Sequence, residues 1–577
     1  MILALTLAVG CLSWTEADLD GDGVLVDGGD CDDTDPTVYP GALDRTGDGL
    51  DRDCDGLDGT DKDGDGALAA EGGGPDCDDS DPLTSPWAPE RCDGLDNDCD
   101  GMPELTCSLS GKIPVARADR RIRGTGVFLG QLRTFVDSGN SVASLGDLDG
   151  DGLGDFAIGG TLTDFTGGNK GSIWIFQHLP DTPLSSTEQA DARIDGASGD
   201  AIGDPGRIAA LADIDGDGLN EFIAGSFRND FSGNNSGVVY FFSSADPEWQ
   251  RGTHQATEIA HAIFYGEADT DRLGDRHAAG DLDGDGLAEL VLSSSRTSND
   301  FFSDGSVYLL FGGADFPSGA HVLPGPTVEL RGNIQQEMAG SGVAIADLDG
   351  DGLGELMIGA MGLQTDKTQT GGIYWIPGDA VPRDSGQLNP DFLLPLPPGD
   401  WQLFDARSVS VDGDTNGDGL DDLLLMAQGE ARENWLIPGR AEGLDQQPLE
   451  ASIAARVSVS HQRNGGRIVH DLDRDGHAEI LFGVSRDPDN QEEGVDCALP
   501  EYSTRTSEAG AAWVIYGPLS GTIDTPDAYI YGQPGQQLGV DATTIDDANG
   551  DGWPELLVSS QNAHCWSGQT WIFFGGP

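Results

Sequence analysis

Basic residues, aromatic residues and long hydrophobic runs are all scarce in this chain of 577 residues. It contains 30 lysines and arginines against 101 acidic residues, which gives a formal net charge of −71. Nucleic acids and anionic membrane surfaces would repel so acidic a chain, so we expect neither as a partner. No apolar run reaches the ~18 residues that a transmembrane helix needs. The charge instead indicates bound cations that neutralise part of it.

Familiar catalytic motifs are missing as well. The sequence has no His-Glu-x-x-His, no Gly-x-Ser-x-Gly and no phosphate loop with a following Lys. Its nine histidines are scattered, and nearly all Asp/Glu pairs belong to the loops described next. We therefore expect no enzymatic activity and assign no catalytic residue.

An acidic nine-residue segment recurs seven times, at intervals of 57 to 76 residues. The first copy reads Asp-Leu-Asp-Gly-Asp-Gly-Leu-Gly-Asp, and the copies occupy residues 147–155, 213–221, 281–289, 347–355, 414–422, 471–479 and 547–555. A fixed motif at a nearly fixed interval is the signature of a repeat architecture.

The spacing of oxygen atoms in these loops predicts a site for a hard cation such as Ca²⁺. Short cation loops use side-chain oxygens at positions 1, 3 and 5 and a backbone carbonyl at position 7. Here a carboxylate also closes every copy at position 9, earlier than the position 12 of an EF-hand. Glycines at positions 4 and 6 of the first copy permit the positive φ angles of a tight coil. Six copies contain no Lys or Arg, and Arg474 is the exception.

A metal-free Asp/Gly-rich hairpin turn is the alternative for any single copy. Sevenfold recurrence, with an acid always at position 9, favours cation binding, because four crowded carboxylates repel one another without a counter-charge. His477 stands at position 7, where only its backbone carbonyl would bind. The predicted ligands are Asp147, Asp149, Asp151, Leu153, Asp155, Asp213, Asp215, Asp217, Leu219, Glu221, Asp281, Asp283, Asp285, Leu287, Glu289, Asp347, Asp349, Asp351, Leu353, Glu355, Asp414, Asn416, Asp418, Leu420, Asp422, Asp471, Asp473, Asp475, His477, Glu479, Asp547, Asn549, Asp551, Trp553 and Glu555.

The segments around the loops predict strands. Each loop is followed by a short apolar run, then by a variable stretch and a strand rich in β-branched and aromatic residues, such as 171–176. A weaker fourth strand follows, such as 192–195, and no helical periodicity intervenes. Four strands per repeat and seven repeats predict an all-β fold, a seven-bladed β-propeller with four-stranded blades.

The order of these segments also predicts how the ring closes. Residues 116–124 align with the fourth strands but precede the first repeat, whereas the last repeat stops after its third strand at Phe574. We expect residues 120–123 to complete blade seven, which would join the two ends of the propeller and remove an exposed edge.

At this point the repeats resemble FG-GAP repeats, the units of the integrin α-subunit propeller, over residues 115–577. In that family the cation loop joins strands 1 and 2 of a blade, so the resemblance implies the same place for the seven loops here. The Phe-Gly and Gly-Ala-Pro signatures of the family are degenerate in this chain, and no domain is inserted between blades.

Residues 18–107 have a different composition, with 28 acidic residues, four basic residues and six of the nine cysteines. Their apolar content is too low for an ordinary core. Two related units each contain an Asp-x-Asp-Gly-Asp-Gly run, an Asp-Cys-Asp-Asp-x-Asp-Pro run and a second Asp/Cys cluster. Equivalent positions suggest the pairs Cys31–Cys54 and Cys77–Cys99, which leaves Cys92 with Cys107. The predicted metal ligands of this region are Asp18, Asp20, Asp22, Asp61, Asp63 and Asp65.

These units resemble the Asp/Cys-rich metal-binding repeats of secreted bacterial proteins and, more distantly, thrombospondin type 3 repeats. The resemblance implies a small fold held by metal and disulfides rather than by buried apolar area. A disordered acidic stalk is the alternative. The oxygen-rich ligand set favours Ca²⁺ over copper or zinc.

The cysteines and the first residues bear on the compartment. Residues 1–11 resemble a bacterial lipoprotein signal in which Cys11 would carry the lipid, although no basic segment precedes the apolar run. An ordinary secretion signal is the alternative, and both imply export. The remaining eight cysteines fit four disulfides in an oxidising compartment, with Cys497–Cys565 joining two neighbouring loops of the propeller.

The face opposite the cation loops is the candidate surface for a protein or glycan partner. The stretches 164–167, 230–233 and 300–303 of three successive repeats share an Asp-Phe pattern. Their side chains Phe165, Phe231, Phe301 and Phe302 would form an apolar patch if exposed, or else pack under their own loops against the next blade.

The sequence thus predicts a leader at 1–17, metal-binding repeats at 18–108 and a propeller at 115–577. The expected function is an extracellular or surface-anchored calcium-binding scaffold for binding or adhesion. The alternatives are a structural or metal-sequestering envelope protein and a polysaccharide-active propeller enzyme. The ligand and the oligomeric state are not encoded in any recognisable motif.

Overall fold

The computed structural model of the chain divides into two compact units, residues 1–107 and 108–577, which are described separately. The described residues are 109–124, 128–129, 132–133, 141–161, 170–180, 182–204, 206–246, 249–298, 303–366, 369–395, 402–403, 409–411, 413–428, 432–441, 443–444, 449–459, 466–485, 509–533, 536–560 and 568–576 in the second unit, and 20, 22, 24, 30–32, 34–40, 42, 51–52, 54, 67, 74–78, 80, 84–86 and 99 in the first. Among them, no helix combines the length and the apolar character required to cross a membrane.

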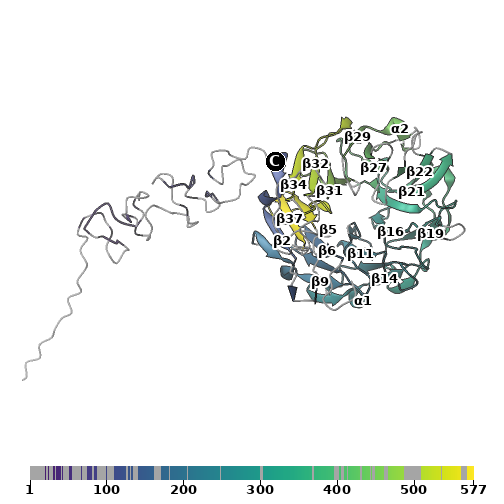
Figure 1. The fold of residues 1–577 in the computed structure, drawn as a ribbon, viewed down its shortest axis with the longest axis horizontal. Coiled ribbons are helices and arrows are strands. Elements are labelled where there is room, and N and C mark those ends of the chain that lie inside the picture. Colours follow the sequence, from purple (N-terminus) through teal and green to yellow (C-terminus); the bar gives the residue numbers. More distant parts are fainter. Residues whose placement is uncertain are drawn as a thin grey trace, which may run out of the picture. The chain divides into compact units, whose positions relative to one another are not determined.

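The second unit is a ring of seven β-sheets, the seven-bladed propeller that the repeats predict (Figure 1). The first four strands of each blade are antiparallel and, except in blade seven, follow one another in sequence from the inside of the ring outwards. The innermost strand leads into the acidic loop, and the loop leads into the second strand. The seven loops therefore lie at corresponding places around one end of the ring.

The strands of the first four blades are as follows. Blade one contains β5 (Ser141–Gly146), β6 (Asp155–Gly160), β7 (Ser172–Phe176) and β9 (Ala192–Asp195). Blade two contains β10 (Ile208–Leu211), β11 (Glu221–Ser226), β12 (Val238–Phe242) and β14 (Ala262–Tyr265). Blade three contains β15 (His277–Gly280), β16 (Glu289–Ser294), β17 (Ser306–Leu310) and β19 (Val328–Arg331). Blade four contains β20 (Ala339–Ala346), β21 (Glu355–Asp366), β22 (Gln369–Ile376) and β24 (Leu393–Pro395).

The remaining blades include the join between the two ends of the unit. Blade five contains β25 (Gln402–Leu403), β26 (Val409–Ser410), β27 (Leu423–Gln428), β28 (Arg432–Ile437) and β29 (Ala455–Val457). Blade six contains β30 (Arg467–Val469), β31 (Glu479–Val484), β32 (Ala511–Ile515) and β34 (Ala528–Tyr531). Blade seven contains β35 (Ala542–Ile545), β36 (Glu555–Ser560), β37 (Gln569–Phe574) and β2 (Arg120–Arg123).

Helical segments are short and lie between strands. Among the described residues they are α1 (Ala256–Ile259), α2 (Leu449–Ser452) and the 3₁₀ turns η3 (Val115–Arg117), η4 (Thr187–Gln189), η6 (Gly378–Ala380) and η7 (Pro390–Phe392). A two-stranded hairpin, β3 (Phe128–Leu129) with β4 (Leu132–Arg133), stands outside the blades.

The hydrophobic core lies between consecutive blades. Each of seven buried clusters draws its side chains from two neighbouring sheets. One of them joins Ile545, Leu557 and Ile572 of blade seven to Phe156 and Ile158 of blade one. Second strands such as β6 and β16 are buried along their whole length, which explains why their sequences are apolar without alternation.

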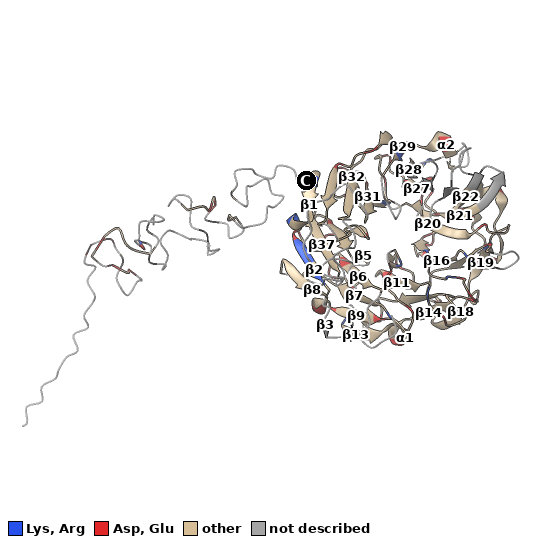
Figure 2. Cartoon of the chain, viewed as in Figure 1, with Lys and Arg blue, Asp and Glu red and all other residues tan. Residues whose placement is uncertain are grey.

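The predicted closure of the ring is confirmed. Strand β2 pairs antiparallel with β37, with Arg121 opposite Trp571, and its three arginines make it a basic strand of this acidic protein (Figure 2). Just before β2, the carboxylate of Asp119 accepts a hydrogen bond from the backbone N–H of Phe574 at 2.8 Å. Residues more than 400 positions apart in sequence thus complete one sheet, as the absent fourth strand of the last repeat indicated.

Most blades carry a fifth, outermost strand that the sequence did not predict. The added strands are β8 (Leu184–Ser186), β13 (Gly252–Gln255), β18 (Gly319–Val322), β23 (Gly386–Gln387), β33 (Gly521–Ile523) and β1 (Gly111–Pro114), and each pairs in parallel with a fourth strand. All but β1 belong to the connection between strands 3 and 4 of the following blade. Each covered edge is therefore protected by its neighbour rather than by its own sheet.

The first unit contains no named helix or strand within its described positions. It does contain two disulfides, Cys31–Cys54 and Cys77–Cys99, as the equivalent positions of its two repeats suggested. Both fit an oxidising compartment. The other proposed pairs, Cys92–Cys107 and Cys497–Cys565, lie outside the described residues, as do Cys11 and the leader.

Candidate metal centres

The carboxylate at position 1 organises each acidic loop of the propeller. In the first loop the two oxygens of Asp147 accept hydrogen bonds from the backbone N–H groups of Gly150 and Gly152, at 2.7 and 2.9 Å. Both glycines have φ near +80°, at +77° and +89°, a conformation that costs other residues free energy. The same pair of bonds recurs around Asp213, Asp281, Asp347, Asp414 and Asp547.

The carboxylates at positions 3 and 5 continue this winding. In the first loop Asp149 accepts from the N–H of Asp151, and Asp151 accepts from the N–H of Leu153. One oxygen of each is used in this way, and the other side of each carboxylate remains available to a cation. The carboxylates of the loop thus hold its own backbone in the coil.

The position-9 carboxylate is buried in all seven loops, at most 1% exposed, and is the strongest sign of a cation site. One oxygen of Asp155 accepts from the N–H of Leu148 at 2.7 Å, and the equivalent bond is present in every loop. The second oxygen has no hydrogen-bond partner in five loops, those closed by Asp155, Glu221, Glu355, Glu479 and Glu555. Buried polar atoms are nearly always paired, so these oxygens indicate a missing ligand.

Electrostatics agree with the geometry. Burial, and then the charges of the other loop aspartates, raise the pKa of Asp155, Glu221, Glu355 and Glu555 to about 8 and that of Glu479 to about 9. Burial raises the pKa of Glu289 to about 7. A divalent cation at the loop centre would supply the positive charge that stabilises the ionised form of these carboxylates.

The structure brings together the predicted side-chain ligands at positions 1, 3 and 9 of the first two loops, in groups that do not include the position-5 carboxylates Asp151 and Asp217. One ligand atom from each of Asp147, Asp149 and Asp155 lies within 4.8 Å of the others, and so do Asp213, Asp215 and Glu221. The sixth loop gathers four, Asp471, Asp473, Asp475 and Glu479. The donors are all oxygens, the ligand type that Ca²⁺ prefers.

The fifth loop differs from the others. Both oxygens of its closing Asp422 are already bonded, one to Thr415 and the other to the N–H of Gly439 at 3.0 Å. The side-chain amide of Asn416 also donates to Asp422, at 3.1 and 3.2 Å. Both oxygens of Glu289, which closes the third loop, are bonded as well, to the N–H groups of Leu282 at 2.7 Å and Gly312 at 3.3 Å. Asp422 accepts in addition from the side chains of Thr415 and Asn416, so the fifth loop offers a cation the least.

Neighbouring loops touch one another around the ring. A Cβ on Gly150 would lie 3.6 Å from the side chain of Leu219, the position-7 residue of the next loop, and the same relation links Gly550 of the last loop to Leu153 of the first. The sixth loop has Arg474 in place of glycine at position 4, and its guanidinium lies 5.0 Å from the ring centre of Trp553. The arginine that replaces glycine in the sixth loop therefore makes a cation–π contact with the tryptophan at position 7 of the seventh loop.

Position 7 has thus two roles. The sequence assigned its backbone carbonyl to the cation, and the structure shows its side chain packing on the preceding loop. His477 follows the pattern, since a Cβ on Gly417 would lie 2.9 Å from its Nε2. Its Nδ1 lies 2.9 Å from a carboxylate oxygen of Asp475.

The two repeats of the first unit have the same local geometry. Asp30 accepts from the N–H of Asp32 and Asp76 accepts from the N–H of Asp78, at 3.0 and 2.9 Å. Asp30 and Asp76 are 3% and 0% exposed, although this unit has little apolar material to bury them. Asp20, Asp22 and Asp30 bring ligand oxygens within 4.8 Å of one another.

Sequence reasoning included Asp20 and Asp22 but missed Asp30 and Asp76. The sequence feature that could have identified these two ligands is the aspartate immediately before the first cysteine of each unit, which recurs in both repeats. Of the other predicted ligands here, Asp18, Asp61, Asp63 and Asp65 lie outside the described residues.

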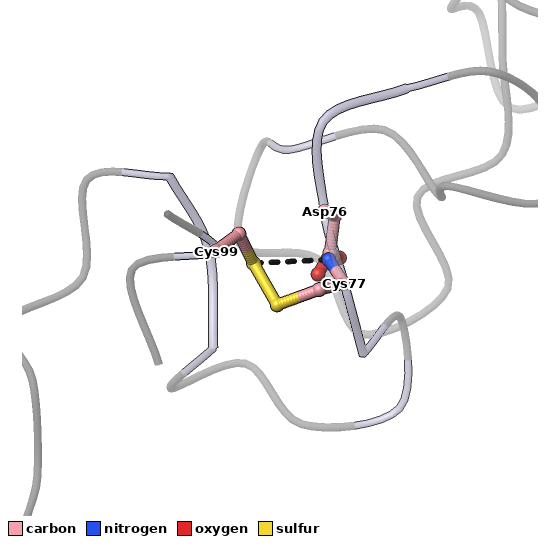
Figure 3. A group of neighbouring side chains, drawn as sticks. All are labelled: Asp76, Cys77 and Cys99. Atoms are coloured by element: carbon pink, nitrogen blue, oxygen red, sulfur yellow. Dashed lines mark hydrogen bonds between the residues drawn. A yellow bond between two sulfur atoms is a disulfide. The ribbon is translucent and has the colours of Figure 1, made fainter. Parts of the chain in front are cut away.

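The cysteines of these repeats hold the backbone around the carboxylates. Figure 3 shows Cys77 bonded to Cys99 beside Asp76, with the N–H of Cys77 donating to the sulfur of Cys99 at 3.0 Å. Cys31 and Cys54 repeat this bond at 3.1 Å. All four sulfurs are in disulfides, so they are not thiolate ligands, and the oxygens of the nearby carboxylates remain as donors.

On the opposite face of the propeller, Phe231 is 64% exposed. Its ring stacks on Tyr265 of the same blade, with ring centres 4.0 Å apart, and does not tuck under the next blade. Phe165, Phe301 and Phe302 lie outside the described residues.

One comparison with known proteins bears on the first unit. A family model for copper binding, described as "Putative metal-binding motif", matches residues 30–60 and 76–104. The two matches begin at Asp30 and Asp76, the buried carboxylates of the two repeats. The first unit thus carries two copies of a metal-binding motif, beside a seven-bladed propeller with acidic loops.

Proposed function

We propose that the protein is an exported calcium-binding propeller that serves as a rigid scaffold for binding or adhesion. The observation that carries the proposal is the buried, unpartnered carboxylate oxygen that closes five of the seven loops. A hard divalent cation would bind it together with the oxygens at positions 1, 3 and 5. The FG-GAP resemblance of the repeats supports the same assignment.

The cation would make the loop end of the ring rigid. Each loop connects the innermost strand of a blade to its second strand, and neighbouring loops pack on one another. Ions bound in the seven acidic loops would fix the relative positions of the blades and so preorganise the loops at the opposite face. The residues of the chain supply only oxygen ligands and shape, and we propose no catalytic role.

Export is supported by the two disulfides and by the apolar first residues, which would be either a secretion signal or a lipid-anchored leader ending at Cys11. Lipid attachment is tested by mass spectrometry of the mature protein, because an acylated Cys11 shifts the mass of the first peptide. The Cys11→Ser variant would be released from membranes if the lipid anchors it.

The proposed metal identity is tested by elemental analysis of purified protein. Four to seven Ca²⁺ per propeller, lost in EGTA together with a fall in the melting temperature, would support the proposal. An unchanged melting temperature in EGTA at low ionic strength would refute it. Stoichiometric copper would instead support the metal-sequestering alternative, which the motif in the first unit favours.

The partner would dock on the face opposite the cation loops. The exposed Phe231, its stacking partner Tyr265 and the 46%-exposed Val322, which is paired with Tyr265 through β18, form an apolar strip there. A glycan array and a pull-down, each in Ca²⁺ and in EGTA, test this docking. The Phe231→Ser variant should lose the partner and keep the wild-type melting temperature.

A further inference from the structure

The central channel of the propeller contains a cavity that neither the loops nor the opposite face explains. Its volume is about 360 Å³, within the range of sites for small molecules. The innermost strands of all seven blades line it, and much of the wall is small or apolar, including Ala209, Ala278, Val343, Val409 and Ile468.

The charged residues of the channel wall are concentrated where the innermost strands begin. Strands β15 and β30 run from that end towards their acidic loops, so Arg276, His277 and Arg467 lie at the end away from the cation sites. All three line the cavity, together with Asp541, and a second histidine, His470, lines it next to the sixth acidic loop. In a protein with only 30 lysines and arginines, two arginines and a histidine at one end of the channel are a marked concentration.

Further arginines stand behind this wall. Arg207 is 9% exposed and bonds to Asp204 at 3.0 Å and to Asp275 at 2.7 Å. Arg272 and Arg276 also approach Asp275, at 3.8 and 3.7 Å. Burial alone would raise the pKa of Asp275, but the charges of Arg276, Arg207 and Arg272 lower it to about 2. Three arginines thus surround Asp275 and keep it ionised.

His277, next to Arg276 in the sequence, has a ring nitrogen without a hydrogen-bond partner. Its Nδ1 is buried and has no hydrogen-bond partner. Burial, and then the charges of Arg276, Arg207 and Arg467, lower its pKa to about 3. Arg467 of blade six and His277 of blade three both line the cavity. The neutral ring is available to donate one hydrogen bond.

We propose that the channel binds a carboxylate carried on a short apolar stem. Arg467 and Arg276 would hold the carboxylate, His277 would donate to it, and the aliphatic stem would lie along the small apolar side chains of the wall. Arg467 now bonds to Asp541 at 3.1 Å, so the ligand would compete with Asp541 for that guanidinium. The inference concerns the channel alone and does not depend on the metal in the loops.

The test is a calorimetric titration of the full chain, kept in 1 mM Ca²⁺, with acetate, butyrate and hexanoate. Affinity should rise along the series, by up to about fourfold per added methylene, whereas hexylamine and hexan-1-ol should not compete with hexanoate. The tripeptide Gly-Gly-Leu and its C-terminal amide identify the source of the carboxylate. Tighter binding of the free-acid peptide than of hexanoate points to a peptide C-terminus, and the reverse points to a free aliphatic acid.

Three variants locate the site. Arg467→Gln should weaken hexanoate at least tenfold. Asp541→Asn should tighten it severalfold, because it removes the competing carboxylate and keeps the side chain's size. Arg456→Gln is the matched control: Arg456 is 31% exposed and bonds to Glu433 at 2.9 Å on the outer strand of blade five, whereas Arg467 is 30% exposed.

Two outcomes would overturn the inference. One is the absence of hexanoate binding to the wild-type chain at 10 mM or below. The other is equal affinity of the wild type and Asp541→Asn, a comparison that holds even if Arg467→Gln fails to fold.

Discussion

The position-9 carboxylate of the fourth loop allows the cation proposal to be tested by the sign of a stability change. Glu355 is fully buried, accepts the N–H of Leu348 with one oxygen at 2.8 Å and leaves the other without a partner. In the Glu355→Gln variant the amide oxygen can still accept that bond, but the second carboxylate oxygen and its charge are lost. The substitution therefore removes a metal ligand with little change to the protein's own contacts.

The expected magnitude follows from linkage. A site with a Kd of about 10 µM, typical of loops of this type, stabilises the folded protein by about 2.7 kcal/mol in 1 mM Ca²⁺. Glu355→Gln should lower the free energy of unfolding by about that amount in Ca²⁺. In EGTA the variant should match the wild type within about 1 kcal/mol or exceed it, because an uncompensated buried carboxylate has been removed. Urea unfolding with both buffers measures the two differences.

Glu337 provides the control. It is as buried as Glu355, but its carboxylate accepts only from protein groups, namely Tyr374 and the N–H groups of Asn333 and Ile334. Glu337→Gln should therefore destabilise equally in both buffers. If Glu355→Gln behaves like this control, the loop is a structural turn and the cation proposal fails.

Three further predictions concern the fifth loop, the ring closure and pH. Asn416→Asp should tighten the weakest cation site, since it removes the amide bond to Asp422 and adds a charge; native mass spectrometry should show one more ion retained at limiting Ca²⁺, and an unchanged count would contradict the reasoning. Replacing Arg120–Arg123 by Gly and Ser should lower the melting temperature by more than 10 °C, and an identical melting curve would disprove the closure. Burial raises the pKa of Asp119 to about 6 from 3.8, so the folded state holds its proton more tightly and this group's favourable effect disappears as pH rises from about 4 to 6. Asp119→Asn should then gain stability relative to wild type between pH 4.5 and 7.5, by up to about 2 kcal/mol, and a constant difference in urea midpoints would refute the shift.

The sequence was sufficient to predict the ring because its signals are local and repeated. Seven copies of one loop, each followed by a buried apolar run, define seven blades without any knowledge of long-range contacts. The missing fourth strand after Phe574 and the surplus strand at Arg120–Arg123 then leave one way to close the ring. The paired cysteines followed from two aligned repeats in the same manner.

Features that depend on contacts between repeats were not predictable. Arg474 appeared as an isolated exception to the loop pattern. In the structure its guanidinium contacts the ring of Trp553, which is 79 residues later and is itself the one tryptophan at position 7 of a loop. Asp30 and Asp76 looked like two more acids in an acidic region until their burial distinguished them. The channel residues gave no signal at all, because Arg276 and Arg467 belong to blades three and six and line one cavity only when the ring closes.

The fifth strands have a consequence for truncated forms of the protein. Because the edge of blade one is covered by β13 of blade two, and the edge of blade two by β18 of blade three, removing a blade that supplies such a strand strips the cover from the blade before it. The uncovered strand presents a row of free backbone donors and acceptors to other chains. Proteolytic nicking or an internal deletion should therefore yield polymers that grow by strand exchange from one ring to the next, rather than smaller soluble rings.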